Sequence, residues 1–147
     1  MHKKFSLESI LNYRTHLVNK EKDKLAYLSS IKDEFLQKRA EYKYDLDKNI
    51  KELEDYKKSG DFTFVILYEN FIKRLNLKIL EIDEIIVKID IEIDKQRRIL
   101  LKTHNDKKII ENLKNNHFVK YKDFVKKEEN KFIDEVTMIK YIRGEDV

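Results

Sequence analysis

The sequence predicts an all-α protein: two long helices paired as an antiparallel coiled-coil hairpin, with the C-terminal helix the longer. Three observations predict this class. The 147 residues include no proline and only two glycines, Gly60 and Gly144, whereas a sheet needs frequent turn residues. Charged residues make up 41% of the chain, which is too many to enclose a globular core easily. Apolar residues also recur in alternating steps of three and four over most of the chain.

The first helix is expected at about residues 6–58. A frame of alternating four- and three-residue steps runs from Leu7 to Tyr56, and ten of its fifteen positions are apolar. Chance at this composition would give about six, so the excess indicates one heptad-spaced stripe. The polar positions in the frame are Arg14, Glu21, Lys32, Arg39 and Asn49.

The turn is expected at about residues 59–62, because Ser59-Gly60-Asp61 is the only interior stretch with turn chemistry. Gly60 suits the left-handed position after a helix, and Asp61 or Thr63 suits the cap of the next helix. Helices joined by so short a turn lie antiparallel, so Leu46 should face Leu75. At the open end this register places Arg14 beside Lys107.

The second helix is expected at about residues 63–142. A frame restarted at Val65 runs to Leu100, and ten of its eleven positions are apolar, the exception being Gln96. Beyond Leu100 the stripe is weaker but keeps a roughly helical spacing. The helix lengths would be about 75 Å and about 115 Å, so the second helix should project about 40 Å past the N-terminus. Its apolar residues there imply an external partner or self-association.

The segment "IIVKIDIEID", residues 85–94, also fits a different structure. From Val87 it alternates apolar and charged residues, which is typical of a half-buried strand. The helical frame nevertheless passes through it, and no turn separates it from its neighbours. We therefore predict a helix here, with Ile91 as an extra apolar residue on the outer face.

Several function classes have no support in this chain. It has no cysteine, too few glycines for a phosphate-binding loop, and no two histidines three or four residues apart. A helical hairpin also offers no pocket that would raise a carboxylate pKa. We expect no catalytic residues, no metal, no cofactor and no small-molecule ligand. The sequence has no recognisable signal peptide, and its longest apolar run, "FTFVILY", is far below the roughly 20 residues of a membrane helix, so a cytoplasmic protein is expected.

Three segments resemble the flagellar FliJ family, and together with length and layout they extend the resemblance over nearly the whole chain. They are "KKFSLESILNYR" with Phe5, Leu7, Ile10, Leu11 and Arg14; "YENFIKRL" with Tyr68, Phe71, Ile72 and Leu75; and "EENKFIDEV" with Glu129, Ile133, Asp134, Glu135 and Val136. The resemblance implies a two-helix coiled coil similar to the central stalk of rotary F-type ATPases. It implies a non-enzymatic protein that binds and stimulates a hexameric export ATPase (FliI-like). It also implies contacts with an export gate protein (FlhA-like) and with export chaperones, at the inner face of the cell membrane.

The resemblance also suggests two interaction surfaces. The gate-contact patch near the turn corresponds by position to Gln37, Tyr44, Phe71 and Leu75. Independently of the resemblance, Tyr44, Phe64 and Phe71 fall beside the heptad frame near the turn, where they would either form a small exposed contact patch or flank the seam and be partly buried. We expect the paired termini and the projecting helix, about residues 110–139, to enter the ATPase ring. The residues expected at that end are Phe5, Leu7, Leu11, Arg14, Ile110, Leu113, Tyr121, Phe132, Ile133 and Val136.

Three other interpretations remain open on the sequence. The first is the equivalent stalk of a virulence type III secretion system. The second is a structural or adaptor coiled coil that binds no ATPase and dimerises through the projecting helix. The third is a nucleic-acid-binding arm that uses Lys102–Lys131, a stretch with nine lysines and five acidic residues. Binding by such an arm should fall steeply with salt, but a solvated helix face explains the same stretch.

Overall fold

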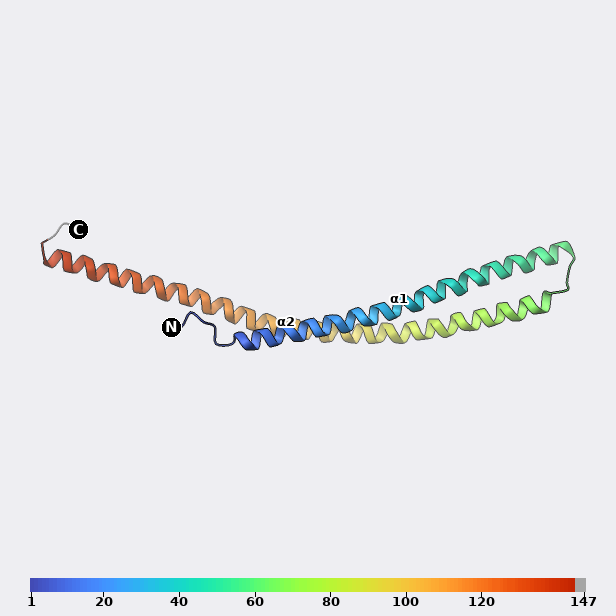
Figure 1. Ribbon diagram of the computed structural model, residues 1–147, viewed down its shortest axis with the longest axis horizontal. Helices are drawn as coiled ribbons and strands as arrows, with labels where there is room; N and C mark the ends of the chain where they lie inside the picture. Colours follow the sequence, from blue (N-terminus) through green and yellow to red (C-terminus); the bar gives the residue numbers. More distant parts are fainter. Residues whose placement is uncertain (145–147) are drawn as a thin grey trace. The chain divides into compact units, whose positions relative to one another are not determined.

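The computed structural model describes residues 1–144, and about 90% of it is helical. Helix α1 spans Glu8–Ser59 with 52 residues, and helix α2 spans Val65–Ile142 with 78 residues. The two helices pack against each other, and residues 1–144 contain no strand. The predicted all-α hairpin with the longer C-terminal helix is therefore confirmed (Figure 1).

The strand-like segment 85–94 lies entirely inside α2. Ile93 is buried and Ile86 and Ile89 are half-buried, as the helical frame predicts. Ile91 is exposed on the outer face, and so is Val87, a second apolar residue outside the stripe. The alternation thus arises because two exposed β-branched residues fall between the buried positions of a helix.

A Schellman motif ends α1. Gly60 has a φ of 78°, its N–H donates to the carbonyl of Lys57, and the N–H of Asp61 donates to the carbonyl of Tyr56. Asp61 then accepts bonds from the backbone N–H of Thr63 at 3.1 Å and from its hydroxyl at 2.7 Å. These bonds, the hydroxyl's above all, lower the pKa of Asp61. Asp61 therefore closes the turn, whereas α2 begins only at Val65.

The chain divides into two compact units, which we describe separately. The hairpin unit is Lys20–Leu100 and contains the turn. In its core, Leu46, Leu75 and Ile79 form a buried cluster, against which Tyr42 and Ile72 pack. Leu46 and Leu75 thus meet, as the antiparallel register predicts. In this unit, every position of the two heptad frames is buried or half-buried.

The polar frame positions of α1 in the hairpin unit mostly have partners on α2. Arg39 Nε lies 2.6 Å from an oxygen of Asp83, and this bond raises the pKa of the guanidinium. Lys32 Nζ lies 2.7 Å from an oxygen of Asp90. These two polar interruptions of the apolar stripe are therefore sites of interhelical pairing. Such pairs help to fix the register of a seam whose other residues are mostly apolar.

The terminal unit comprises Met1–Asn19 and Leu101–Val147. Phe5, Leu11 and Val18 are buried, and the ring of Phe5 lies 5.6 Å from that of His117. Ion pairs join Glu8 to Lys114 at 3.0 Å and Arg14 to Asp106 at 3.6 Å. Arg14 therefore meets an acid, one residue away from its expected neighbour Lys107, and Lys107 pairs with Glu111 along α2.

Within the terminal unit, α2 continues well past the N-terminal segment (Figure 1). Large apolar side chains along this continuation are exposed: Val119, Phe124, Phe132, Ile133, Met138, Ile139, Tyr141 and Ile142. Neither α1 nor α2 contains a stretch that is long and apolar enough to cross a membrane.

Candidate protein-interaction surfaces

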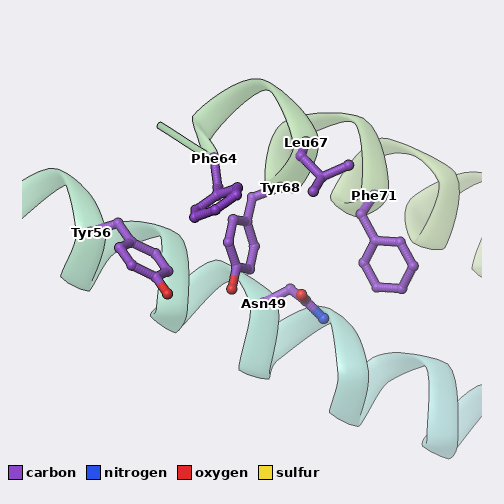
Figure 2. A pocket seen from close by; sticks show the side chains of 6 residues that line it. All are labelled: Asn49, Tyr56, Phe64, Leu67, Tyr68 and Phe71. Atoms are coloured by element: carbon purple, nitrogen blue, oxygen red, sulfur yellow. The ribbon is translucent and has the colours of Figure 1, made fainter. Parts of the chain in front are cut away.

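An open cavity of about 430 Å³ lies at the turn end of the hairpin unit (Figure 2). We call it the tip groove. Its lining residues are Asn49 and Tyr56 on α1, and Phe64, Leu67, Tyr68 and Phe71 at the start of α2. The groove exists because Phe64, Leu67 and Phe71 fall outside the heptad frame and remain exposed beside the seam.

Three of the rings in the tip groove form a cluster. The centroid of Tyr56 lies 5.5 Å from that of Tyr68 and 6.4 Å from that of Phe64. The hydroxyl of Tyr68 donates to Glu52 Oε2 at 2.9 Å, and this bond is the main reason why the pKa of Tyr68 is raised to about 12. The phenol therefore stays protonated at physiological pH, and its ring is held in place beside the groove.

The predicted gate-contact residues lie in the hairpin unit but differ in exposure. Gln37, Tyr44 and Phe71 are exposed, and Phe71 also lines the tip groove. Leu75 is buried in the cluster with Leu46. Sequence reasoning singled out Tyr44, Phe64 and Phe71 because they fall beside the heptad frame near the turn. It missed Leu67, for which the pattern gives no signal, and it treated Asn49 only as a polar frame position.

The residues expected at the ATPase end fall into two groups. Phe5 and Leu11 are buried in the terminal unit, and Leu7, Arg14 and Ile110 are half-buried, so these five residues are at least partly covered within that unit. The remaining five lie on α2: Tyr121 and Val136 are half-buried, while Leu113, Phe132 and Ile133 are exposed.

A second open cavity, of about 510 Å³, lies on the continuation of α2. Its lining residues are Phe124, Val125, Glu128, Glu129, Phe132 and Ile133. It is a shallow apolar surface of one helix, flanked by two carboxylates. Such a surface can bind a partner helix or a hydrophobic channel wall, but it offers no enclosed site for chemistry.

Clusters of metal-ligating side chains and unpaired buried polar atoms are two further features that can mark a functional site. Within residues 1–144, no three histidine or acidic side chains are placed to hold a metal ion. In the same range, every buried side-chain nitrogen or oxygen has a hydrogen-bond partner. The features that stand out are two exposed apolar surfaces, the tip groove and the face of α2 beyond residue 118.

Comparison with protein-family models gives one assignment for the whole chain. The model for the flagellar FliJ protein matches residues 2–146. Comparisons with curated proteins and with solved structures gave no match. Because the family match covers nearly the entire chain, the protein belongs to the FliJ family of flagellar export proteins.

Proposed function

We propose that this protein is a non-enzymatic, stalk-like component of the flagellar type III export apparatus that binds and stimulates the hexameric export ATPase. It would act at the cytoplasmic face of the membrane and couple the ATPase to the export gate and to export chaperones. The observation that carries the proposal is the family assignment, which covers residues 2–146. The exposed apolar face of α2 supports it, because that face needs a partner.

The ATPase contact is assigned to the continuation of α2. Between residues 101 and 118, the N-terminal segment packs against α2, as the contact of Phe5 with His117 shows. Further along, Phe124 and Phe132 are exposed, although they keep the helical spacing. Burying a side chain such as Phe132 is worth about 1.5–3 kcal/mol, so a few such contacts would hold the helix in an apolar ring channel.

The test uses the full-length protein with purified export ATPase, and measures ring formation and ATP hydrolysis. The unaltered protein should raise both. Phe132→Asp should abolish the increase while leaving the helical content unchanged, since Phe132 is exposed. Val119→Asp is the matched control, because Val119 is similarly exposed but lies on roughly the opposite side of the helix.

If both Phe132→Asp and Val119→Asp abolish the stimulation of the ATPase, or if both leave it intact, the assignment of the ATPase contact to this face of α2 is removed. If the unaltered protein has no effect on the ATPase but forms a dimer that Phe132→Asp dissociates, the adaptor interpretation replaces the stalk. Binding to RNA or DNA that disappears at high salt, again without an effect on the ATPase, would support the nucleic-acid arm.

The gate contact is assigned to Gln37 and Tyr44 on α1 and Phe71 on α2, all within the hairpin unit. All three side chains are exposed, and two are aromatic, the type of residue that most often anchors an interface. Leu75 is buried, so it would support the gate contact only indirectly, through its packing against Leu46.

The double variant Tyr44→Ala/Phe71→Ala should reduce the capture of the gate protein's cytoplasmic domain by at least about tenfold, as expected when two aromatic anchors are removed. Tyr27→Ala serves as the control, since Tyr27 is an equally exposed tyrosine of the hairpin unit. Unchanged capture with an intact helical spectrum would exclude this patch.

A further inference from the structure

We propose that the tip groove is a receptor for a basic side chain, an arginine above all, presented by a segment of a partner protein. The choice of partner rests on the proposed function, because the partner is sought among export components. The argument for the groove itself does not depend on that function. The groove combines aromatic faces with hydrogen-bond acceptors, and the hydroxyl of Tyr68 and one N–H of Asn49 already donate within the protein. This combination selects a cation with an aliphatic stem over an acidic or a purely apolar side chain.

The apolar part of the groove suits the stem and the plane of an arginine. Leu67 and Phe71 line one side and Tyr56, Phe64 and Tyr68 the other (Figure 2). A guanidinium stacks on aromatic faces and is attracted by their electron-rich centres. The protein already makes contacts of this kind, since Lys78 Nζ lies 5.3 Å from the ring centroid of Tyr42.

Asn49 provides the first acceptor. It is a polar position in the seam, like Glu21, Lys32 and Arg39, but those three bond to residues of α2. The side-chain nitrogen of Asn49 instead donates back to the carbonyl of Asp45, at 2.7 Å. Its amide oxygen can therefore accept a bond from an occupant of the groove. Figure 2 shows Asn49 beneath the space between Tyr68 and Phe71.

The second acceptor is the phenol oxygen of Tyr68. Its hydrogen is committed to Glu52, so the oxygen can only accept a further bond. The carboxylates of Glu52 and Asp55 line an adjoining cavity, which shares Tyr56 with the tip groove. On the same helix, Lys57 is paired with Glu69 at 3.7 Å. An acidic occupant would meet these carboxylates, and an apolar one would cover acceptors without bonding to them, which is costly.

The test uses the full-length protein, labelled at leucine methyl groups, and the peptide acetyl-Ala-Ala-Arg-Ala-Ala-amide. The same peptide with leucine or glutamate at the centre provides the comparison. The arginine peptide should give saturable shifts at the methyl groups of Leu67, with a dissociation constant of roughly 1–10 mM, as expected for one anchored side chain. The leucine and glutamate peptides should give none.

Asn49→Leu should weaken binding of the arginine peptide by about tenfold, because it removes one acceptor from the groove. The variant should fold, since position 49 lies in the apolar stripe. Asn76→Leu, at an exposed asparagine of α2, should bind as the unaltered protein does. Glu52→Gln should also weaken binding, because it removes a carboxylate but can still accept the bond from Tyr68.

Three results would overturn the proposal: no saturable shift up to about 50 mM of the arginine peptide, equal binding of the leucine peptide, or unchanged binding by Asn49→Leu. Stimulation of the ATPase is measured separately. Arginine binding without stimulation leaves the groove assignment standing and removes the stalk function. Stimulation of the ATPase without binding of the arginine peptide leaves the stalk function standing and removes the groove assignment.

Discussion

Gln96 donates hydrogen bonds from its side-chain amide to both the carboxylate and the backbone carbonyl of Glu21, the second at 3.1 Å. Among residues 1–144, Gln96 is the one buried polar side chain, and it is the one polar position in the heptad frame from Val65 to Leu100. The carboxylate side chain of Glu21 is only 14% exposed. The pair is thus a hydrogen-bonded polar layer within the hairpin unit.

This layer predicts a specific pH response. The bond from Gln96 is the largest cause that lowers the pKa of Glu21, with Lys24 adding to it and burial opposing it. Because the folded pKa lies below the ordinary value of 4.5, the ionised group stabilises the hairpin above that pH. The contribution is lost as the pH falls through the folded pKa. Gln96→Leu should raise the pKa of Glu21, as measured by NMR titration of its carboxyl carbon.

Arg97→Leu is the control for this titration, because Arg97 is the exposed neighbour of Gln96. It should leave the carboxyl titration of Glu21 unchanged. The double variant Glu21→Leu/Gln96→Leu should show a weaker loss of stability between pH 7 and about pH 4 in urea unfolding. If Gln96→Leu leaves the titration of Glu21 where it was, the bond seen here does not hold the carboxylate.

The core cluster predicts which leucines matter for stability. Leu75 is 3% exposed and packs with Leu46, whereas Leu80, five residues along the same helix, is 59% exposed. Leu75→Ala should lower the free energy of unfolding by about 2–5 kcal/mol, because it leaves a cavity. Leu80→Ala should change it by less than about 0.5 kcal/mol. Urea unfolding followed by circular dichroism measures both, and equal losses would contradict the heptad frame.

Much of the fold could be predicted because one periodic pattern runs through nearly the whole chain. The frame identified Leu46, Leu75 and Gln96 as seam positions, and Gly60 as the end of the first helix. The partners of the charged seam positions were harder to predict. A shift of one residue decides whether Arg14 meets Lys107 or Asp106, and a frame alone does not resolve such a shift.

The candidate site could be predicted only in part. Aromatic residues outside the frame, such as Phe64 and Phe71, indicated an exposed patch near the turn. The tip groove depends on details that the frame does not contain: the bond of Asn49 back to its own helix and the bond of Tyr68 to Glu52. These bonds need side-chain positions, which follow from packing and not from spacing.

The ion pair between Lys32 and Asp90 predicts a modest, salt-dependent coupling between the helices. Its atoms are 2.7 Å apart, but both side chains are about a third exposed or more. A double-mutant cycle with Lys32→Met and Asp90→Asn should give a coupling free energy of about 0.2–1 kcal/mol in urea unfolding. Most of it should disappear in about 0.5 M salt. A coupling that salt leaves unchanged would mean that the pair acts through packing of the lysine stem.

The turn predicts a difference between the two glycines, which share a left-handed backbone. Gly60 has a φ of 78° and Gly144 a φ of 72°, and a Cβ added to either would meet no atom within 4 Å. Alanine therefore introduces backbone strain alone, about 1–2 kcal/mol. Gly60→Ala should lower the global free energy of unfolding by that amount, because the Schellman motif connects two paired helices. Gly60→Asn should cost less, because asparagine tolerates this conformation.

Gly144→Ala is the matched control for the turn. Gly144 follows the end of α2, where Tyr141 and Ile142 are exposed, so strain there can be relieved by fraying of the last helical turn. We therefore expect no shift of the urea midpoint, and only faster amide exchange near residue 142. If the two alanine variants lower the midpoint equally, fraying does not relieve the strain at Gly144. If neither lowers it, the chain can reverse direction without the left-handed conformation at Gly60.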